Sequence, residues 1–398
     1  MTAPARPTVL YYCQHSVGLG HLVRSLAIAE ALSEGFRVVV VSGGAVPPQL
    51  VVPGGVELVA LPAIGASDGR GAQLISVDSG FELEDAWRLR IEMLMHLLKE
   101  LRPIALVIEL FPFGRRKFAR ELLPLLDAAT ALNPAPVIVS SVRDILVDGK
   151  DNQQELDDRA AHLLNRYFDA IIVHADPQFA TLDETFHPSI PIEPSIHYSG
   201  FVVRSDRRPP RRRSLETEVL VSAGGGKIGM ALFRTVVTAH RRYLAHQGVR
   251  TRVVTGPFLA PTVVAELEAE ATSCEGLEVS RFEPQLCQAM AAASVSVSQC
   301  GYNTALDIIR AGVPALVVPY DVDGETEQAL RASRLAERGV VQCLPMSDLT
   351  PESLSLAILN ALSMAPPSVT FDLDGAAATA RIVADLCEHR TSHAVVPS

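Results

Sequence analysis

The sequence predicts an α/β protein made of two doubly wound domains, each with a parallel sheet covered by helices on both faces. Short apolar, β-branched segments alternate with longer amphipathic segments, and the alternation stops at a Pro/Arg-rich segment and then starts again. Near-continuous apolar strands separated by helices are typical of parallel sheets. The length of 398 residues agrees with more than one domain, since a domain has about 150 residues.

The elements follow in order along the chain. In the first series we expect strands at 9–13, 37–41, 56–61, 104–110, 137–141 and 170–174, and helices at 22–33, 81–102 and 115–132. In the second series we expect strands at 218–222, 251–255, 277–281, 295–298 and 315–319, and helices at 229–247, 260–274, 285–293, 302–311 and 326–338. A last helix is expected at 375–389.

The segment 199–214 separates the two series and carries two Pro and six Arg. Such a segment is a poor helix and a poor strand, so it is interpreted as a linker. Attraction of a phosphate-bearing partner is the alternative. The expected division is a first domain at 1–203, a linker at 204–214, a second domain at 215–370, and a C-terminal helix and tail at 371–398.

Composition narrows the function classes. With 35 Lys and Arg against 45 Asp and Glu, the net charge is −10, which argues against bulk nucleic-acid binding but leaves a local basic patch open. The six cysteines form no C-x-x-C pair and no zinc spacing. The apolar segments are strand-sized, so we expect no transmembrane segment and a cytoplasmic location. Peripheral membrane contact stays open.

A first motif lies between the first expected strand and the first expected helix. Gly18 and Gly20 permit a tight turn and a close approach to a ligand. His21 stands at the start of the helix, where a neutral imidazole could act as a base. The alternative is that His21 only caps the helix. His15 in the same loop is a second candidate.

Two further motifs follow strands of the second series. Gly224, Gly225 and Gly226 precede a helix, so their backbone amides could cradle a phosphate, although the P-loop spacing is absent. The third motif holds Gly301, Asn303, Thr304 and Asp307. Its first three residues suit a diphosphate at a helix N-terminus, and Asp307, one turn later, suits a ribose diol. Helix capping by Asn303 and Thr304 is the alternative.

In these segments the chain resembles the GT-B glycosyltransferases, in particular the branch of the peptidoglycan GlcNAc-transferase and a group of bacterial proteins known only as predicted glycosyltransferases. The resemblance covers most of the chain. It rests on the GLGH run at 18–21, the glycines at 224–226 and the stretch 282–339, in which 301–307 is the strongest match. The segment 109–115 is similar to the narrower group. The resemblance implies two Rossmann-like domains that face a cleft.

The resemblance also implies roles for individual residues. Phe282 and Glu283 would lie by the nucleotide base, and Gly301, Asn303 and Thr304 would hold the diphosphate. Asp307 would bind the ribose, and Glu327 and Gln328 would face the donor sugar. Glu327 departs from the paired Gln of the peptidoglycan enzyme, and Arg331 stands where that enzyme has Asn, so the sugar is not fixed by this match. His21 would lie on the acceptor side. Separately from the resemblance, and by analogy with other pairs of a base and its orienting group, Glu109 or Asp144 could orient His21.

The expected chemistry is inverting transfer of a hexose or N-acetylhexosamine from a UDP-sugar to an acceptor hydroxyl. Helix N-terminal amides would stabilise the leaving diphosphate, so neither a metal nor a cofactor is expected. The D-x-D run at 321–323 is interpreted as a sugar-side loop. A nucleotide-sugar hydrolase or epimerase of the same fold, and a binding protein without catalysis, remain alternatives, and segment 18–26 is also similar to UDP-sugar hydrolases. The acceptor, and UDP against dTDP, stay open.

Overall fold

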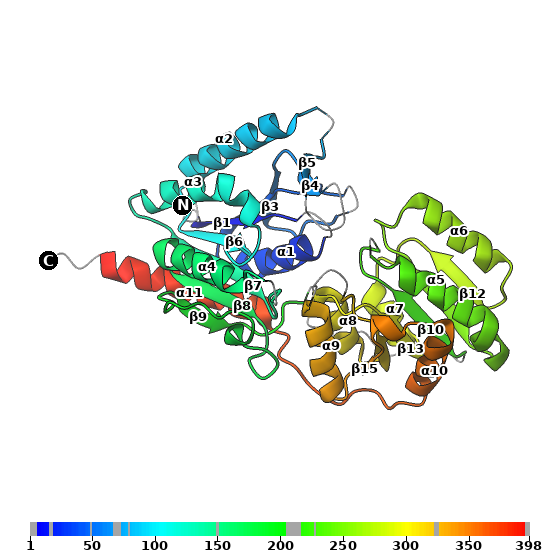
Figure 1. Ribbon diagram of the computed structural model, residues 1–398. Helices are drawn as coiled ribbons and strands as arrows, with labels where there is room; N and C mark the ends of the chain where they lie inside the picture. The colour runs from blue at the N-terminus through cyan, green and yellow to red at the C-terminus, as the bar shows by residue number, and fades with distance from the viewer. Residues whose placement is uncertain are drawn as a thin grey trace. The chain divides into compact units, whose positions relative to one another are not determined.

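The computed structural model describes residues 6–15, 19–47, 50–66, 73–78, 80–148, 151–203, 216–226, 228–321 and 326–394 (Figure 1). The chain divides into two compact units. The first takes in the chain up to Leu146, from Lys150 to Arg204, and from Asp372 onward. The second runs from Ser205 to Phe371 and includes Val147–Gly149. None of the described helices is long and apolar enough to cross a membrane.

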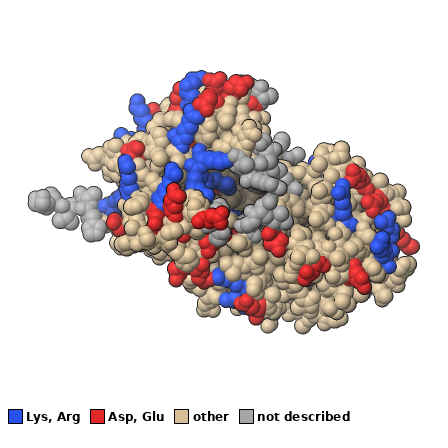
Figure 2. Space-filling model, in the orientation of Figure 1, with Lys and Arg blue, Asp and Glu red and all other residues tan. Residues whose placement is uncertain are grey.

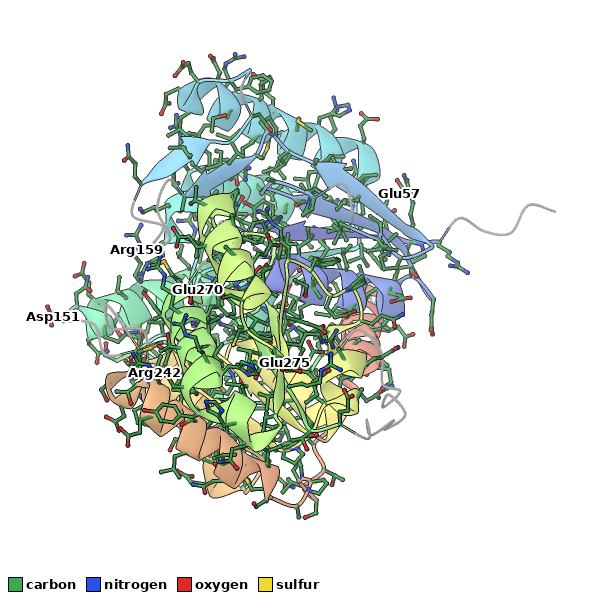
Figure 3. The ribbon with its side chains drawn as sticks, turned by 90° about the vertical axis from the view of Figure 1, so that its right-hand side faces the viewer. Glu57, Asp151, Arg159, Arg242, Glu270 and Glu275 are labelled. Carbon is green, nitrogen blue, oxygen red and sulfur yellow. The ribbon has the colours of Figure 1, made fainter. Side chains whose placement is uncertain are left out.

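The first unit is built on a parallel sheet in the order β3-β2-β1-β6-β7-β8-β9. Strand β1 pairs with β2 on one side and β6 on the other, so that Tyr11 lies opposite both Val40 and Val107. At the β3 edge, Glu57 forms an ion pair with Arg37 at 2.8 Å (Figure 3). The strands are β1 (Thr8–Cys13), β2 (Arg37–Ser42), β3 (Val56–Ala60), β6 (Ala105–Glu109), β7 (Val137–Arg143), β8 (Ala170–His174) and β9 (Ser195–Tyr198), with a separate hairpin of β4 (Ile64–Ala66) and β5 (Leu74–Ser76).

Helices cover this sheet. On one face α1 and α11 pack against each other and against alternate strand residues such as Val9, Tyr11 and Val38, so the C-terminal helix belongs to the first unit's core. The fully buried Arg90 of α2 pairs with Glu121 of α3 at 2.6 Å and donates to Gln14 at 2.7 Å. The helices are α1 (Gly20–Leu32), α2 (Leu83–Leu101), η1 (Arg116–Phe118), α3 (Ala119–Thr130), α4 (Gln153–Tyr167), η2 (Leu182–Glu184) and α11 (Gly375–Ala394).

The second unit repeats the plan with a parallel sheet in the order β12-β11-β10-β13-β14-β15. Its strands are β10 (Glu218–Ser222), β11 (Arg250–Val254), β12 (Leu277–Ser280), β13 (Val295–Ser298), β14 (Ala315–Val317) and β15 (Gln342–Cys343). Its helices are α5 (Met230–Ala239), η3 (His240–Leu244), η4 (Ala245–Gln247), α6 (Pro261–Thr272), α7 (Leu286–Ala292), α8 (Tyr302–Ala311), α9 (Glu327–Glu337), η6 (Met346–Asp348) and α10 (Pro351–Leu362). Val219, Val221 and Val297 point into a core shared with α5 and α10.

The prediction of two α/β units with parallel sheets is confirmed. The structure adds α4, α10, β9 and β15, which the alternation of apolar and amphipathic segments does not reveal. It also corrects the start of the interpreted linker: Phe201 and Val202 are buried, and Val202 bridges to Asp374, so 199–203 belongs to the first unit. The expected linker 204–214 lies outside the described residues.

Candidate functional site

Each sheet has a topological switch point, at which the order of the strands along the sheet reverses. The sequence motifs follow strands that border these switch points. In the first sheet β1, β2 and β3 run outward one way and β6 to β9 the other, so the switch lies between β1 and β6. In the second sheet the switch lies between β10 and β13. Open α/β sheets bind ligands beyond the carboxyl ends of the strands at such a switch point. Each unit therefore offers one candidate site.

At the first switch point, His21 contacts a buried carboxylate. Glu109 is the last residue of β6 and its side chain is 0% exposed, whereas the side chain of His21, near the start of α1, is 15% exposed. His21 Nδ1 lies 2.9 Å from Glu109 Oε1. Arg24, one turn later on α1, forms an ion pair with the same carboxylate oxygen. The helix α1 begins after Leu19 without a side-chain cap, so the capping alternative for His21 is not what the structure shows.

Electrostatics fixes the protonation of this pair. Burial alone would raise the pKa of Glu109, but the Arg24 charge and the hydrogen bond from His21 outweigh it, so its pKa lies below the usual range. An ionised carboxylate can only accept hydrogen bonds, so His21 Nδ1 carries the proton. Burial, with the charge of Arg115, lowers the pKa of His21 to about 3. The imidazole is therefore neutral, with Nε2 as its unprotonated nitrogen.

A chain of buried polar groups continues from Glu109. Its Oε2 accepts from the hydroxyls of Tyr11 at 3.2 Å and Ser141 at 2.8 Å. Ser141 Oγ lies 2.8 Å from His174 Nε2, and burial lowers the pKa of His174 to about 3. The sequence analysis missed Arg24, Ser141 and His174. Ser141 and His174 carried a usable signal, since both are polar residues near the ends of apolar strands.

The other expected residues of the first unit take separate places. Asp144 is buried, and its Oδ1 accepts from the backbone N–H of Ile145 at 2.9 Å. The carboxylate that contacts His21 is that of Glu109. His15 is buried with Nε2 3.2 Å from Ser42 Oγ, and burial lowers its pKa to about 4. Gly20 is the first residue of α1, and Gly18 lies outside the described residues.

At the second switch point the site is made of backbone. Gly224 and Gly226 have φ of +53° and +86°, and a Cβ added to Gly226 would lie 1.9 Å from the carbonyl oxygen of Thr255. A Cβ on Gly225 would lie 3.0 Å from the Phe258 ring. A Cβ on Gly224 would lie 3.6 Å from Thr304 Oγ1, so the glycine loop lies beside the start of α8. At Gly226 only glycine fits without a shift of the backbone.

The start of α8 lacks a side-chain cap. Gly301 is its N-cap residue and no side chain caps the helix, so capping by Asn303 and Thr304 is not what the structure shows. Asp307, one turn later, has a side chain 28% exposed and lies 3.6 Å from Arg310. Ser222 and Ser298 end the two switch-point strands opposite each other. Within the described part of the chain their buried hydroxyls have no hydrogen-bond partner.

The remaining expected residues follow β12 or lie at the start of α9. Phe282 is 59% exposed, and Glu283 accepts from Arg252 at 3.2 Å. Gln328 Oε1 accepts from the backbone N–H groups of Cys300 and Tyr320 at 3.1 and 3.2 Å. Glu327 is buried and pairs with Arg331 at 2.7 Å. Gln328 thus connects the loops after β13 and β14. Contact of Glu327 and Gln328 with a donor sugar stays a prediction.

Among the residues that the structure describes, no three His, Cys, Asp or Glu side chains are grouped so that they could hold a metal ion. The D-x-D run at 321–323 lies partly outside the described residues.

Known proteins resemble the chain in sequence and in fold. Residues 220–371 match the model of the glycosyltransferase family 28 C-terminal domain. A UDP-N-acetylglucosamine--N-acetylmuramyl-(pentapeptide) pyrophosphoryl-undecaprenol N-acetylglucosamine transferase of Mesorhizobium japonicum is 30% identical over 177 residues, which is 43% of this chain and 47% of that protein. The chain thus spans about half the length of this curated relative.

Solved structures share the whole architecture. A UDP-glucosyltransferase from Polygonum tinctorium matches with a TM-score of 0.61 at 17% identity, over 98% of this chain and 100% of its own. MurG of Acinetobacter baumannii matches with a TM-score of 0.55 at 16% identity, over 96% and 100%. The chain therefore has the fold of these structures, GT-B, and within it residues 220–371 are similar to the glycosyltransferase family 28 C-terminal domain.

Proposed function

We propose that this protein transfers a hexose or N-acetylhexosamine from a UDP-sugar to an acceptor hydroxyl, with inversion and without a metal. The observation that carries the proposal is the neutral His21 whose Nδ1 donates to the ionised Glu109 at the first switch point. The match of residues 220–371 to a glycosyltransferase domain and the names of the relatives support the donor class.

In the proposed reaction His21 Nε2 takes the proton of the acceptor hydroxyl as that oxygen attacks the anomeric carbon. Glu109 holds the ring in the tautomer that leaves Nε2 unprotonated, and it stabilises the imidazolium that forms. The carboxylate is held in turn by Arg24, Ser141 and Tyr11. A base positioned in this way contributes about 100-fold or more to the rate.

The second unit would bind the nucleotide diphosphate. The N–H groups at the uncapped start of α8 and the glycine loop at 224–226 offer donors for the charge that develops on the leaving group. Asp307 would accept from the ribose hydroxyls. No donor here has to move or to lose a proton, so charge on the diphosphate is stabilised by preorganised backbone.

The first experiment is a thermal-shift and calorimetric screen against UDP, dTDP, GDP, ADP and their sugar conjugates, with and without EDTA. A ligand that binds only the folded protein raises its melting temperature. We expect UDP or a UDP-sugar to stabilise the protein equally in both conditions. Absence of stabilisation by every nucleotide would remove the donor-site assignment.

Paired variants then separate the two sites. His21→Ala should lower turnover, measured as UDP release with a panel of hydroxyl acceptors, by about 100-fold while UDP affinity is retained. Asp307→Ala should do the reverse and mainly weaken UDP binding. Equal loss of turnover and affinity in His21→Ala would make His21 structural. UDP release that no acceptor accelerates would favour the hydrolase alternative.

A further inference from the structure

A buried histidine that the proposed reaction does not use lies in the same row of polar groups as Glu109. The sheet of the first unit places β6, β7, β8 and β9 side by side in that order. One polar residue comes from the carboxyl-terminal part of each strand or directly after it, and the four are Glu109, Ser141, His174 and Ser199. All four are buried. The row therefore runs across the sheet, inside the protein, from the Glu109 carboxylate toward the β9 edge.

Hydrogen bonds join this row from end to end. Ser141 Oγ lies 2.8 Å from Glu109 Oε2 and 2.8 Å from His174 Nε2. Ser199 Oγ lies 2.9 Å from His174 Nδ1 and 2.9 Å from the carbonyl oxygen of Gly200. Each serine hydroxyl has one proton to donate, and each lies between two groups that could accept it. The direction of one hydrogen bond therefore determines the direction of the next.

The row has two consistent directions, which differ in the nitrogen of His174 that carries the proton. Burial keeps this imidazole neutral, with its pKa lowered to about 3, so one ring nitrogen donates and the other accepts. In the first direction, Ser199 donates to Gly200 O and accepts from Nδ1–H, and the bare Nε2 takes the proton of Ser141. In the second direction, Ser199 donates to Nδ1 and the Nε2–H donates to Ser141. The hydroxyl of Ser141 then donates to Glu109 Oε2.

The charge of Glu109 decides between the two directions. In the first, Oε2 keeps, among the described contacts, the Tyr11 hydroxyl at 3.2 Å, which also lies 2.9 Å from Ser141 Oγ. In the second, Oε2 gains the shorter bond from Ser141. Hydrogen bonds to a charged group are about twice as strong as neutral ones, whereas Gly200 O loses only a neutral donor. Figure 2 shows Lys and Arg side chains on the face of the first unit near the β1 and β6 labels of Figure 1, and positive charge favours the ionised carboxylate. The second direction is therefore the more stable.

Resting on the proposed function, we propose that His174 is a positioning residue for the pair of His21 and Glu109. Its Nε2–H donates to Ser141, which directs the serine proton onto Glu109 Oε2. The other carboxylate oxygen, Oε1, is thereby left to His21 and Arg24. Glu109 stays ionised and fixed in orientation while His21 takes the proton of the acceptor hydroxyl. His174 acts on His21 only through Ser141 and Glu109.

The tautomer of His174 is the direct test, and it needs neither UDP nor an acceptor. Long-range proton–nitrogen NMR correlations distinguish a protonated ring nitrogen from a bare one, and the signals are assigned through the backbone of His174. We expect the proton on Nε2. His240 is the internal reference, because its Nε2 lies 3.0 Å from the carbonyl oxygen of Glu275, which can only accept. A proton on His174 Nδ1 would overturn the proposal.

Two variants separate the donor at Nε2 from the rest of the side chain. His174→Gln can bring an amide N–H to the place of Nε2, whereas His174→Asn, which is one methylene shorter, can bring it only to that of Nδ1. We expect kcat per folded molecule, measured as UDP release, to fall by about tenfold in His174→Asn. His174→Gln should restore most of it, and the KM for the UDP-sugar should stay unchanged in both variants.

His240→Gln is the matched control in the second unit. His240 is equally buried, and both of its ring nitrogens form hydrogen bonds, to Thr251 Oγ1 at 2.9 Å and to Glu275 O at 3.0 Å. Its replacement should lower the unfolding free energy and leave kcat per folded molecule unchanged. A fall in kcat as large as that of His174→Asn would contradict a specific role of the row.

Equal loss of kcat in His174→Gln and His174→Asn would make His174 a packing residue, and so would an unchanged kcat in both. Should neither variant fold, the tautomer in the native chain still decides. Failure of UDP to bind would sink the proposed function and leave the tautomer of His174 as measured. A proton on Nδ1 in a chain that transfers the sugar would remove only this inference.

Discussion

The two switch points have the same topology and opposite chemistry. At the first, between β1 and β6, side chains make the site: Glu109 is held by Arg24, His21, Ser141 and Tyr11. At the second, between β10 and β13, backbone makes the site: glycines with positive φ lie beside an uncapped helix start, and two serine hydroxyls there lack hydrogen-bond partners in the described structure.

This difference shows how one supersecondary plan can serve two tasks. In the proposed reaction, proton transfer requires a titratable group whose protonation is set by its neighbours, and His21 would supply it. Binding a permanently charged diphosphate requires fixed donors and close approach, which glycine and helix N-termini provide. Substitutions in the first site should therefore act through charge and protonation, and substitutions in the second through backbone geometry.

The largest effect is expected for Glu109→Gln. Removing the carboxylate leaves the buried Arg24 without its ion pair, which costs about 3–5 kcal/mol of unfolding free energy. It also removes the charge that stabilises the His21 imidazolium, so turnover should fall by about 100-fold or more. Urea unfolding and UDP release measured at a temperature where the variant stays folded give the two numbers.

Glu121→Gln is the matched control. Glu121 is equally buried in the same unit and pairs with Arg90, and the hydrogen bonds of that pair run to Tyr12, Gln14 and backbone carbonyls. It should lose comparable stability but keep most of its turnover per folded molecule. If both variants lost turnover equally, the role of Glu109 would reduce to holding the fold.

Gly226→Ala should disrupt the second site through its backbone geometry and leave its charges unchanged. The added Cβ would meet the Thr255 carbonyl oxygen at 1.9 Å, so the loop must move. We expect UDP affinity to fall by at least about tenfold, with about 2 kcal/mol of lost stability. Calorimetry with UDP measures the first effect and urea unfolding the second.

Gly248→Ala controls for backbone strain. Gly248 also has a positive φ, of +70°, but no atom lies within 4 Å of its added Cβ, and it follows η4. This variant should lose about 1 kcal/mol and bind UDP like the native chain. Unchanged UDP affinity in Gly226→Ala would contradict the assignment of the glycine loop as a diphosphate site.

The strands and the glycines that locate the two candidate sites could be predicted from the sequence. The apolar runs at 9–13 and 218–222 identify β1 and β10, and the glycines after them mark both sites. The sequence analysis offered Glu109 or Asp144 as the carboxylate that orients His21, but the choice between them was not accessible, since 88 residues separate His21 from Glu109. That contact arises because β6 pairs with β1, and strand order depends on tertiary packing rather than on local pattern.

The missed helices have different causes. In α4 the sequence QQELDDRAAHLLNRY is largely polar, so its buried residues Ala160, Ala161 and Leu164 make a weak apolar stripe. For α10 a signal was present: Thr350 is an N-cap followed by Pro351 at the first helical position, and Thr350 Oγ1 accepts from Ser353 N–H at 3.1 Å. The ion pair of Arg24 with Glu109 depends on the pairing of β6 with β1, which spacing along the chain does not encode.

The pH profile tests the protonation of the first site. A base is active when unprotonated, so its loss on acidification occurs as pH falls through its pKa. Because the pKa of His21 is lowered to about 3, kcat/KM measured from neutral to mildly acidic pH should show no loss near about 6.5, the ordinary value for His. An acid limb near that ordinary value would mean that the contact with Glu109, which raises the pKa of His21, outweighs the effect of burial, which lowers it.

The smallest effects are expected from replacing one serine in each site by alanine and comparing the unfolding free energies. Ser141 donates to Glu109 Oε2 at 2.8 Å and contacts His174 at 2.8 Å. Ser141→Ala leaves buried groups unsatisfied and should cost about 1–3 kcal/mol. In the described structure, Ser298 has a buried hydroxyl without a hydrogen-bond partner, so Ser298→Ala should change the unfolding free energy by less than about 0.5 kcal/mol.

Adding UDP sharpens the serine comparison further. If the Ser298 hydroxyl binds the donor, Ser298→Ala should weaken UDP binding and leave the unfolding free energy of the ligand-free protein unchanged. Ser141→Ala should lower that unfolding free energy and leave UDP binding unchanged. A large loss of unfolding free energy in the ligand-free Ser298→Ala variant would contradict the proposal that the Ser298 hydroxyl serves only to bind the ligand. In that case the hydroxyl of Ser298, like that of Ser141, would stabilise the fold of its own unit.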